Sequence, residues 1–129
     1  METIKWRTVG LTSVSILLAL IFLAAGGSKL ASPEAHLRTF VRWGYPGWFL
    51  YLAGLVEVAG AVLLLIPAVR FYGAVLLACT MLGATFTHLR AGEMAAVAVP
   101  LVLLAFAGLI VLVDRPRRPS GTTPDRGKE

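Results

Sequence analysis

The stretch that decides the fold is residues 51–67, YLAGLVEVAGAVLLLIP, in which nearly every side chain is apolar or small and a single acid, Glu57, stands in the middle. An apolar helix of about 20 residues crosses the roughly 30 Å hydrocarbon core of a bilayer. Glu57 lies ten residues past Gly47, where this apolar block begins, so we place it about 15 Å deep. An ionised acid near the bilayer centre costs about 2.5–3.5 kcal/mol or more. We therefore expect Glu57 to face protein or water and to be either protonated or paired.

Apolar blocks of this kind make up most of the chain. Hydrophobic residues are 57% of its 129 residues and charged residues only 15%, whereas soluble domains carry about 25% charged residues. Four blocks predict membrane-spanning helices at residues 8–28, 47–66, 70–89 and 94–113. The last two connections are short, so consecutive helices must be antiparallel neighbours. We predict an all-α membrane protein, a four-transmembrane-helix up-and-down bundle over residues 1–113, followed by a disordered basic tail at 114–129.

The connection between the first two spans is long enough to hold structure of its own. Ser32 is a good N-cap, Pro33 suits the first helical position and Gly44 is a natural C-terminal stop. The pattern between them predicts a short amphipathic helix on the outer membrane face. Aromatic residues follow it, either as a belt at the level of the lipid headgroups or as a platform for a ring-shaped ligand: Trp43, Tyr45 and Trp48.

Basic residues gather at the ends of the predicted spans, so the net charge of +5 reflects topology and not nucleic-acid binding. With a cytoplasmic N-terminus, eight basic residues lie inside: Lys5, Arg7, Arg70, Arg115, Arg117, Arg118, Arg126 and Lys128. Four lie outside: Lys29, Arg38, Arg42 and Arg90. The positive-inside rule then predicts a multi-pass protein in the lipid bilayer with both termini cytoplasmic.

Small residues flank Glu57 on one side of its helix. Gly54 and Gly60 share that side with the acid, and small residues at such spacing let a second helix approach closely. The third span has a similar face that includes Gly73, Gly83 and the hydroxyl of Thr80, which could hydrogen-bond a carboxyl group. Glu57 is thus either a structural acid bonded across helices or part of a ligand or proton site.

Two further residues are candidates for a polar site with Glu57 and Thr80. Lys29, at the outer end of span one, either snorkels to the interface or joins an internal cluster. A direct bridge from Lys29 to Glu57 requires span one to continue past residue 29. His88, at the outer end of span three, is either an interfacial hydrogen-bonding group or a proton relay or ligand. No catalytic nucleophile or metal motif is present, and the single Cys79 excludes a disulfide within one chain.

Three segments together resemble the DoxX family of small four-helix bacterial membrane proteins. They are FLAAGGSKL (22–30), YPGWFLYLAGLVEVAGAVLLLIPAVR (45–70) and MLGATFTHLRAGE (81–93). Lys29 and Leu30 match the Lys-Leu pair that follows the small residues ending the family's first span. Glu57 and Gly60 match the acid and small residues of its second span.

The resemblance implies a location in the bacterial inner membrane. It also implies an accessory or quinone-facing subunit of a membrane-associated oxidoreductase complex, with quinone as cofactor and either redox partner proteins or further copies of itself as partners. The sequence contains no catalytic motif that would make the chain an enzyme by itself. One alternative is a small four-span transporter. It is disfavoured because the membrane acid of such transporters normally lies in the first span, whereas Glu57 lies in the second. The other alternative is a structural or assembly protein without a catalytic role.

Overall fold

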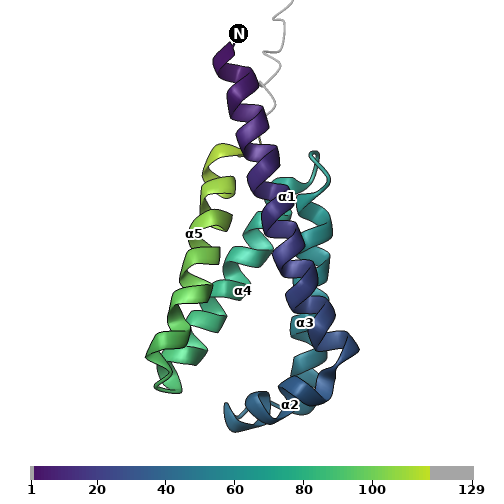
Figure 1. The fold of residues 1–129 in the computed structure, drawn as a ribbon, viewed down its shortest axis with the longest axis vertical. Helices are drawn as coiled ribbons and strands as arrows, with labels where there is room; N and C mark the ends of the chain where they lie inside the picture. The colour runs from purple at the N-terminus through teal and green to yellow at the C-terminus, as the bar shows by residue number, and fades with distance from the viewer. Residues whose placement is uncertain (1, 117–129) are drawn as a thin grey trace, which may run out of the picture.

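The computed structural model describes residues 2–116, and all of its regular elements are helical (Figure 1). In chain order they are α1 (Glu2–Ala31), α2 (Pro33–Arg42), α3 (Gly47–Leu64), α4 (Arg70–Arg90), the 3-10 turn η1 (Met94–Val97) and α5 (Ala98–Val113). Four helical segments are long and apolar enough to cross a membrane: α1, α3, α4 and η1 together with α5. The predicted all-helical membrane bundle is therefore confirmed.

Helix α1 is longer than the predicted span of 8–28. It begins at Glu2, runs unbroken through Gly26 and Gly27, and ends at Ala31. It projects beyond the other helices at the end that carries the N-terminus (Figure 1). The continuation past residue 29 meets the condition for Lys29 to reach into the bundle.

Helix α2 has the bounds that its sequence signals predict and lies across the opposite end of the bundle, here called the α2 end (Figure 1). Ser32 is the N-cap residue and Pro33 occupies the first turn, as predicted, although the Ser32 side chain makes no capping hydrogen bond. The helix stops because Gly44 adopts a left-handed conformation, with φ +89°. The N–H of Tyr45 then donates to the carbonyl of Phe40 at 3.0 Å, the pattern of a Schellman motif.

Helix α4 ends in the same way. Gly92 has φ +74°, and the N–H of Glu93 donates to the carbonyl of His88 at 2.9 Å. A left-handed residue at this position is favourable for glycine because it has no Cβ. Both motifs turn the chain back at the α2 end, and each fixes the position of the residue that follows its glycine.

The hydrophobic core lies in the half of the bundle nearer the N-terminus. There the helices bury large side chains against each other, chiefly Phe22, Leu64, Leu77 and Ile110. Two close helix crossings depend on glycine. A Cβ at Gly26 of α1 would lie 2.7 Å from the carbonyl oxygen of Gly54 in α3, and one at Gly73 of α4 would lie 2.8 Å from that of Gly60.

Gly83 does not belong to this packing, although its sequence context grouped it with Gly54, Gly60 and Gly73. A Cβ at Gly83 would meet no atom within 4 Å. The physical reason is that the helices diverge: α1 with α3, and α4 with α5, separate from each other toward the α2 end (Figure 1). Gly83 lies in the diverging half.

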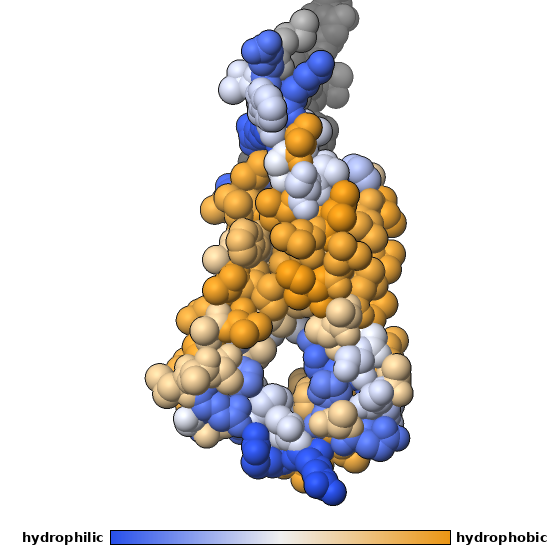
Figure 2. Space-filling model, viewed as in Figure 1, coloured by the Kyte–Doolittle hydropathy of each residue, from blue (hydrophilic) through white to orange (hydrophobic). Residues whose placement is uncertain are grey.

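On the face seen in Figure 2, apolar residues cover the middle of the bundle and hydrophilic residues gather toward both of its ends. Many large apolar side chains are exposed on the outer faces of the four long helices. Such a surface suits contact with lipid. The prediction of a disordered tail concerns residues 114–129, of which 117–129 lie outside the described residues.

The Gly26 crossing leads to a stability prediction with a matched neighbour. Gly26→Ala should destabilise the bundle by about 1–3 kcal/mol, because its Cβ meets backbone that cannot move independently. Gly27→Ala should be neutral or stabilising by up to about 1 kcal/mol, because its Cβ meets nothing within 4 Å and alanine favours helix. Denaturation of the detergent-solubilised protein measures the free energy of unfolding of both variants. Equal effects of the two substitutions would contradict the close crossing.

Candidate functional site

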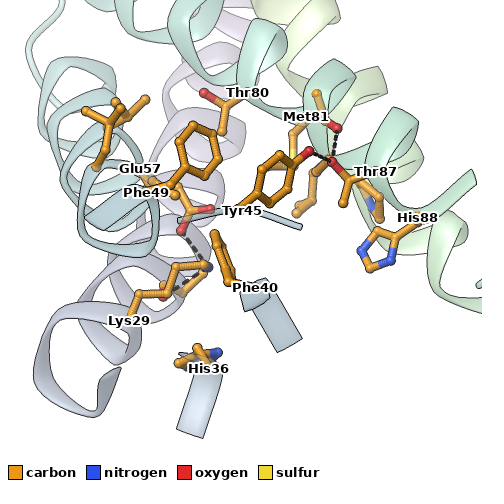
Figure 3. Close-up of a pocket in the computed structure, with 18 of the residues that line it drawn as sticks. Lys29, His36, Phe40, Tyr45, Phe49, Glu57, Thr80, Met81, Thr87 and His88 are labelled. Carbon is orange, nitrogen blue, oxygen red and sulfur yellow. Dashed lines mark hydrogen bonds and ion pairs between the residues drawn. The ribbon is translucent and has the colours of Figure 1, made fainter. Parts of the chain in front are cut away.

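The diverging half of the bundle encloses a cavity of about 750 Å³. All four long helices and α2 contribute to its wall, which is mostly apolar. The four residues proposed from sequence as a polar site all line this one cavity: Lys29, Glu57, Thr80 and His88. Figure 3 shows Lys29 with Glu57 on one side and Thr87 with His88 on the other.

Lys29 and Glu57 form an ion pair in the cavity wall. Lys29 Nζ lies 3.0 Å from Glu57 Oε2, and the side chains are 16% and 7% exposed, respectively. The close approach of Gly26 to Gly54 holds α1 against α3 at this level. Pairing the two groups at this depth costs less than leaving either charge alone, because each compensates the other where lipid cannot.

Both members of this pair can still form a hydrogen bond with a ligand in the cavity. A lysine ammonium has three donors, and Lys29 uses two of them, on Glu57 and on the carbonyl of Ala25 at 3.5 Å. Among the described residues nothing donates to Oε1 of Glu57. This oxygen is not fully buried. The wall therefore offers a neighbouring donor and acceptor to a ligand.

A second polar group lies on α4. The Tyr45 hydroxyl is 2.6 Å from Thr87 Oγ1, which lies 2.8 Å from the carbonyl oxygen of Gly83. Because the threonine hydroxyl has one proton and gives it to that carbonyl, Tyr45 is the donor to Thr87. The Schellman turn at Gly44 places Tyr45 so that it spans the opening between α3 and α4 at the α2 end.

Three aromatic rings lie between the polar groups (Figure 3). The Tyr45 ring stacks on Phe49 with centroids 4.7 Å apart, and Phe40 lies 6.1 Å from Tyr45 and 6.3 Å from Phe49. The predicted aromatic group thus divides. Tyr45 and Trp43 line the cavity, whereas Trp48 is 65% exposed.

Glu93 connects α2 to the end of α4 and was not found by sequence analysis. Its Oε1 accepts from Arg42 at 2.8 Å and from the Trp43 indole at 3.1 Å, and its Oε2 lies 2.9 Å from His88 Nδ1. The signal in the sequence is an acid directly after a glycine helix stop and five residues after His88. Hydrogen bonds from His88 first, and then from Trp43, hold the pKa of Glu93 below its ordinary value of 4.5.

The proposed hydrogen bond from a threonine of α4 to Glu57 does not form. Thr80 donates to the carbonyl of Leu76 at 2.8 Å, and Thr87 is occupied by Tyr45 and Gly83. His88 also bonds Glu93 and not Glu57. The cavity separates α4 from α3 at this level, so Lys29 of α1 is the partner that Glu57 finds.

The ion pair predicts non-additive stability effects. Lys29→Met leaves the Glu57 carboxylate unpaired and should destabilise by about 3–5 kcal/mol, the usual cost of breaking a buried pair. Lys29→Met with Glu57→Leu should cost less than Lys29→Met alone, because no charge is left behind. A double-mutant cycle with Glu57→Leu, measured by unfolding in detergent, tests this. Additivity within about 0.5 kcal/mol would show that the two side chains act independently.

The lowered pKa of Glu93 predicts a loss of the α2 attachment in acid. A carboxylate whose pKa is lowered on folding contributes stability that is complete above its unfolded value, here 4.5, and lost as pH falls through the lower folded value. Trp43 emission should therefore change below pH 4.5, measured with Trp6→Phe and Trp48→Phe to remove the other tryptophans.

In that background, Glu93→Gln should show the altered emission at neutral pH and lose the acid transition. Glu34→Gln, a change on the exposed side of α2, is the control and should titrate like the parent. If the emission of Glu93→Gln still changed in acid as in the parent, the change would be due to the titration of another group.

Comparison with protein families gives a match that covers most of the chain. Residues 13–110 match the DoxX-like family, which covers the four membrane helices from within α1 to within α5. No curated protein and no solved structure matches the chain significantly.

Proposed function

The chain belongs to the DoxX-like family and is an integral membrane protein, and on this premise we propose that it is a quinone-facing or accessory subunit of a membrane-associated oxidoreductase complex. The quinone ring would lie in the cavity. Electrons would come from a redox centre of a partner protein, and this chain would supply the binding site.

One observation supports this proposal above all: an apolar cavity with aromatic rings carries an ion pair that keeps one donor and one acceptor free. A quinone head is a flat ring with two opposite carbonyl oxygens. Lys29 can donate to a carbonyl of the oxidised form, and Oε1 of Glu57 can accept from a hydroxyl of the reduced form. The cluster of Phe40, Tyr45 and Phe49 offers surfaces for the ring.

The same pair argues against a small multidrug-type transporter. In that function the membrane acid must be available to a cationic substrate. Here the Glu57 carboxylate already has a resident cation, Lys29 Nζ, at 3.0 Å. The ion pair therefore favours an uncharged ligand with oxygen atoms over an organic cation.

We further propose that the α2 end faces away from the cytoplasm. Lys5, Arg7 and Arg70 lie toward the N-terminal end of the bundle, whereas α2 and the end of α4 lie at the other (Figure 1). Over the whole sequence, the predicted topology assigns eight basic residues to the side of the two termini and four to the side of α2, and this excess favours a cytoplasmic location for the N-terminal end. Reporter fusions to the two ends test this orientation, and a periplasmic signal from the N-terminus would reverse it.

Glu57→Gln tests the proposed role of the acid. Glutamine retains an oxygen that can accept from Lys29, so the variant should insert and fold. It should weaken binding of the reduced form at least about tenfold, equivalent to about 1.4 kcal/mol, because the amide nitrogen that replaces one carboxylate oxygen cannot accept from its hydroxyl, and it should reduce partner-dependent quinone reduction. Glu34→Gln on α2 is the matched control.

Two outcomes would contradict the proposal. Unchanged binding of the reduced form in Glu57→Gln would remove the acid from the site. A change in stability with no quinone binding by the native protein would indicate a structural or assembly role. For the partner, purification in mild detergent from cells with native expression should yield a complex, and recovery of this chain alone would count against a subunit function.

A further inference from the structure

We infer that the ligand of the cavity carries an apolar tail and enters sideways from the bilayer, through an opening between α3 and α4. This opening, here called the α3–α4 window, is bordered by Leu52 and Val56 of α3 and by Leu76, Cys79 and Gly83 of α4, all of which line the cavity. The inference rests on the proposed function and concerns the route and the chemical class of the ligand.

Two contacts define the ends of the window. Toward the N-terminal end, α3 and α4 cross closely, since a Cβ at Gly60 would lie 2.6 Å from the Leu77 side chain. Toward the α2 end, the hydrogen bond from Tyr45 to Thr87 bridges the two sides. Both contacts lie within or next to the membrane-spanning segments. The window between them therefore faces the hydrocarbon part of the bilayer.

The border of the window is open and uncharged. Leu52 is 44% exposed, Cys79 is exposed, and a Cβ at Gly83 would meet nothing within 4 Å. Small residues on α4 leave room for a chain to pass, and the absence of charge from these five border residues suits an alkyl or isoprenoid tail. The charged pair lies deeper, on α1 and α3, where it suits the polar head.

The alternative routes are less favourable. From the aqueous side, α2 covers the cavity and is fixed to α4 through Glu93, which holds Arg42 and Trp43. The flank between α5 and α1 is also hollowed (Figure 2), and Phe22, Ala25, Val99 and Leu103 border it. We assign the route to the α3–α4 side because Cys79 and Gly83 place two small, exposed residues on a single helix there.

The test compares two fully substituted quinones, decylubiquinone with a tail and duroquinone without one, bound to the full chain in phospholipid nanodiscs. Quenching of Trp43, which lines the cavity, reports binding after Trp6→Phe and Trp48→Phe. Gly83→Phe and Cys79→Phe fill the window. Leu82→Phe, on the exposed side of α4 but not in the cavity wall, is the control, and Val99→Phe narrows the opposite flank.

Gly83→Phe and Cys79→Phe should weaken decylubiquinone binding at least about tenfold more than duroquinone binding, and more than Val99→Phe weakens it, whereas Leu82→Phe should alter the binding of neither quinone. Unchanged decylubiquinone binding in both window variants, or loss only in Val99→Phe, would overturn the window while the proposed function stands. Displacement of decylubiquinone by a phospholipid of equal chain length would assign the window to lipid and overturn the inference. If neither quinone quenched Trp43 in the protein with an unsubstituted window, the proposed function would be rejected, and the inference with it.

Discussion

The ion pair between Lys29 and Glu57 is the interaction on which the arrangement of this protein depends. A carboxylate in the middle of an apolar helix needs a compensating charge, and the nearest available lysine lies on another helix. The pair forms at 3.0 Å only because α1 continues to Ala31 and because Gly26 and Gly54 allow α1 and α3 to touch backbone to backbone. The chemistry of one acid thus explains both a helix length and a helix crossing.

The bundle divides into a packed half and a hollow half, and the division has a residue-level cause. Near the N-terminal end, Phe22, Leu64 and Leu77 fill the space between helices. Toward the α2 end the helices diverge, and small side chains such as Gly83 and Cys79 on the wall leave the space between them unfilled as a cavity. The packed half supplies rigidity, and the hollow half keeps a polar pair accessible within the membrane. A binding site needs both, because a pair fully enclosed by packing could not meet a ligand.

Two glycine turns convert local backbone geometry into the walls of the site. Gly44 and Gly92 adopt left-handed conformations, and the residues after them, Tyr45 and Glu93, make the contacts that close the α2 end. Tyr45 reaches Thr87, and Glu93 joins Arg42 of α2 to His88 of α4. These contacts explain why α2, which buries only Phe40, still covers the cavity.

The sequence by itself determined the four apolar helices, the bounds of α2 and the importance of Glu57, because hydrophobic length, helix-stop glycines and an isolated membrane acid are local signals. It also identified Lys29, Thr80 and His88 as candidates, all of which line the cavity. Only the tertiary structure decided which groups meet. Lys29 and not a threonine pairs with Glu57, Glu93 and not Glu57 holds His88, and Gly83 borders a cavity and not a helix contact. The reason is that helix periodicity specifies a face of each helix, whereas the angle at which two helices diverge depends on side-chain volumes along the whole contact.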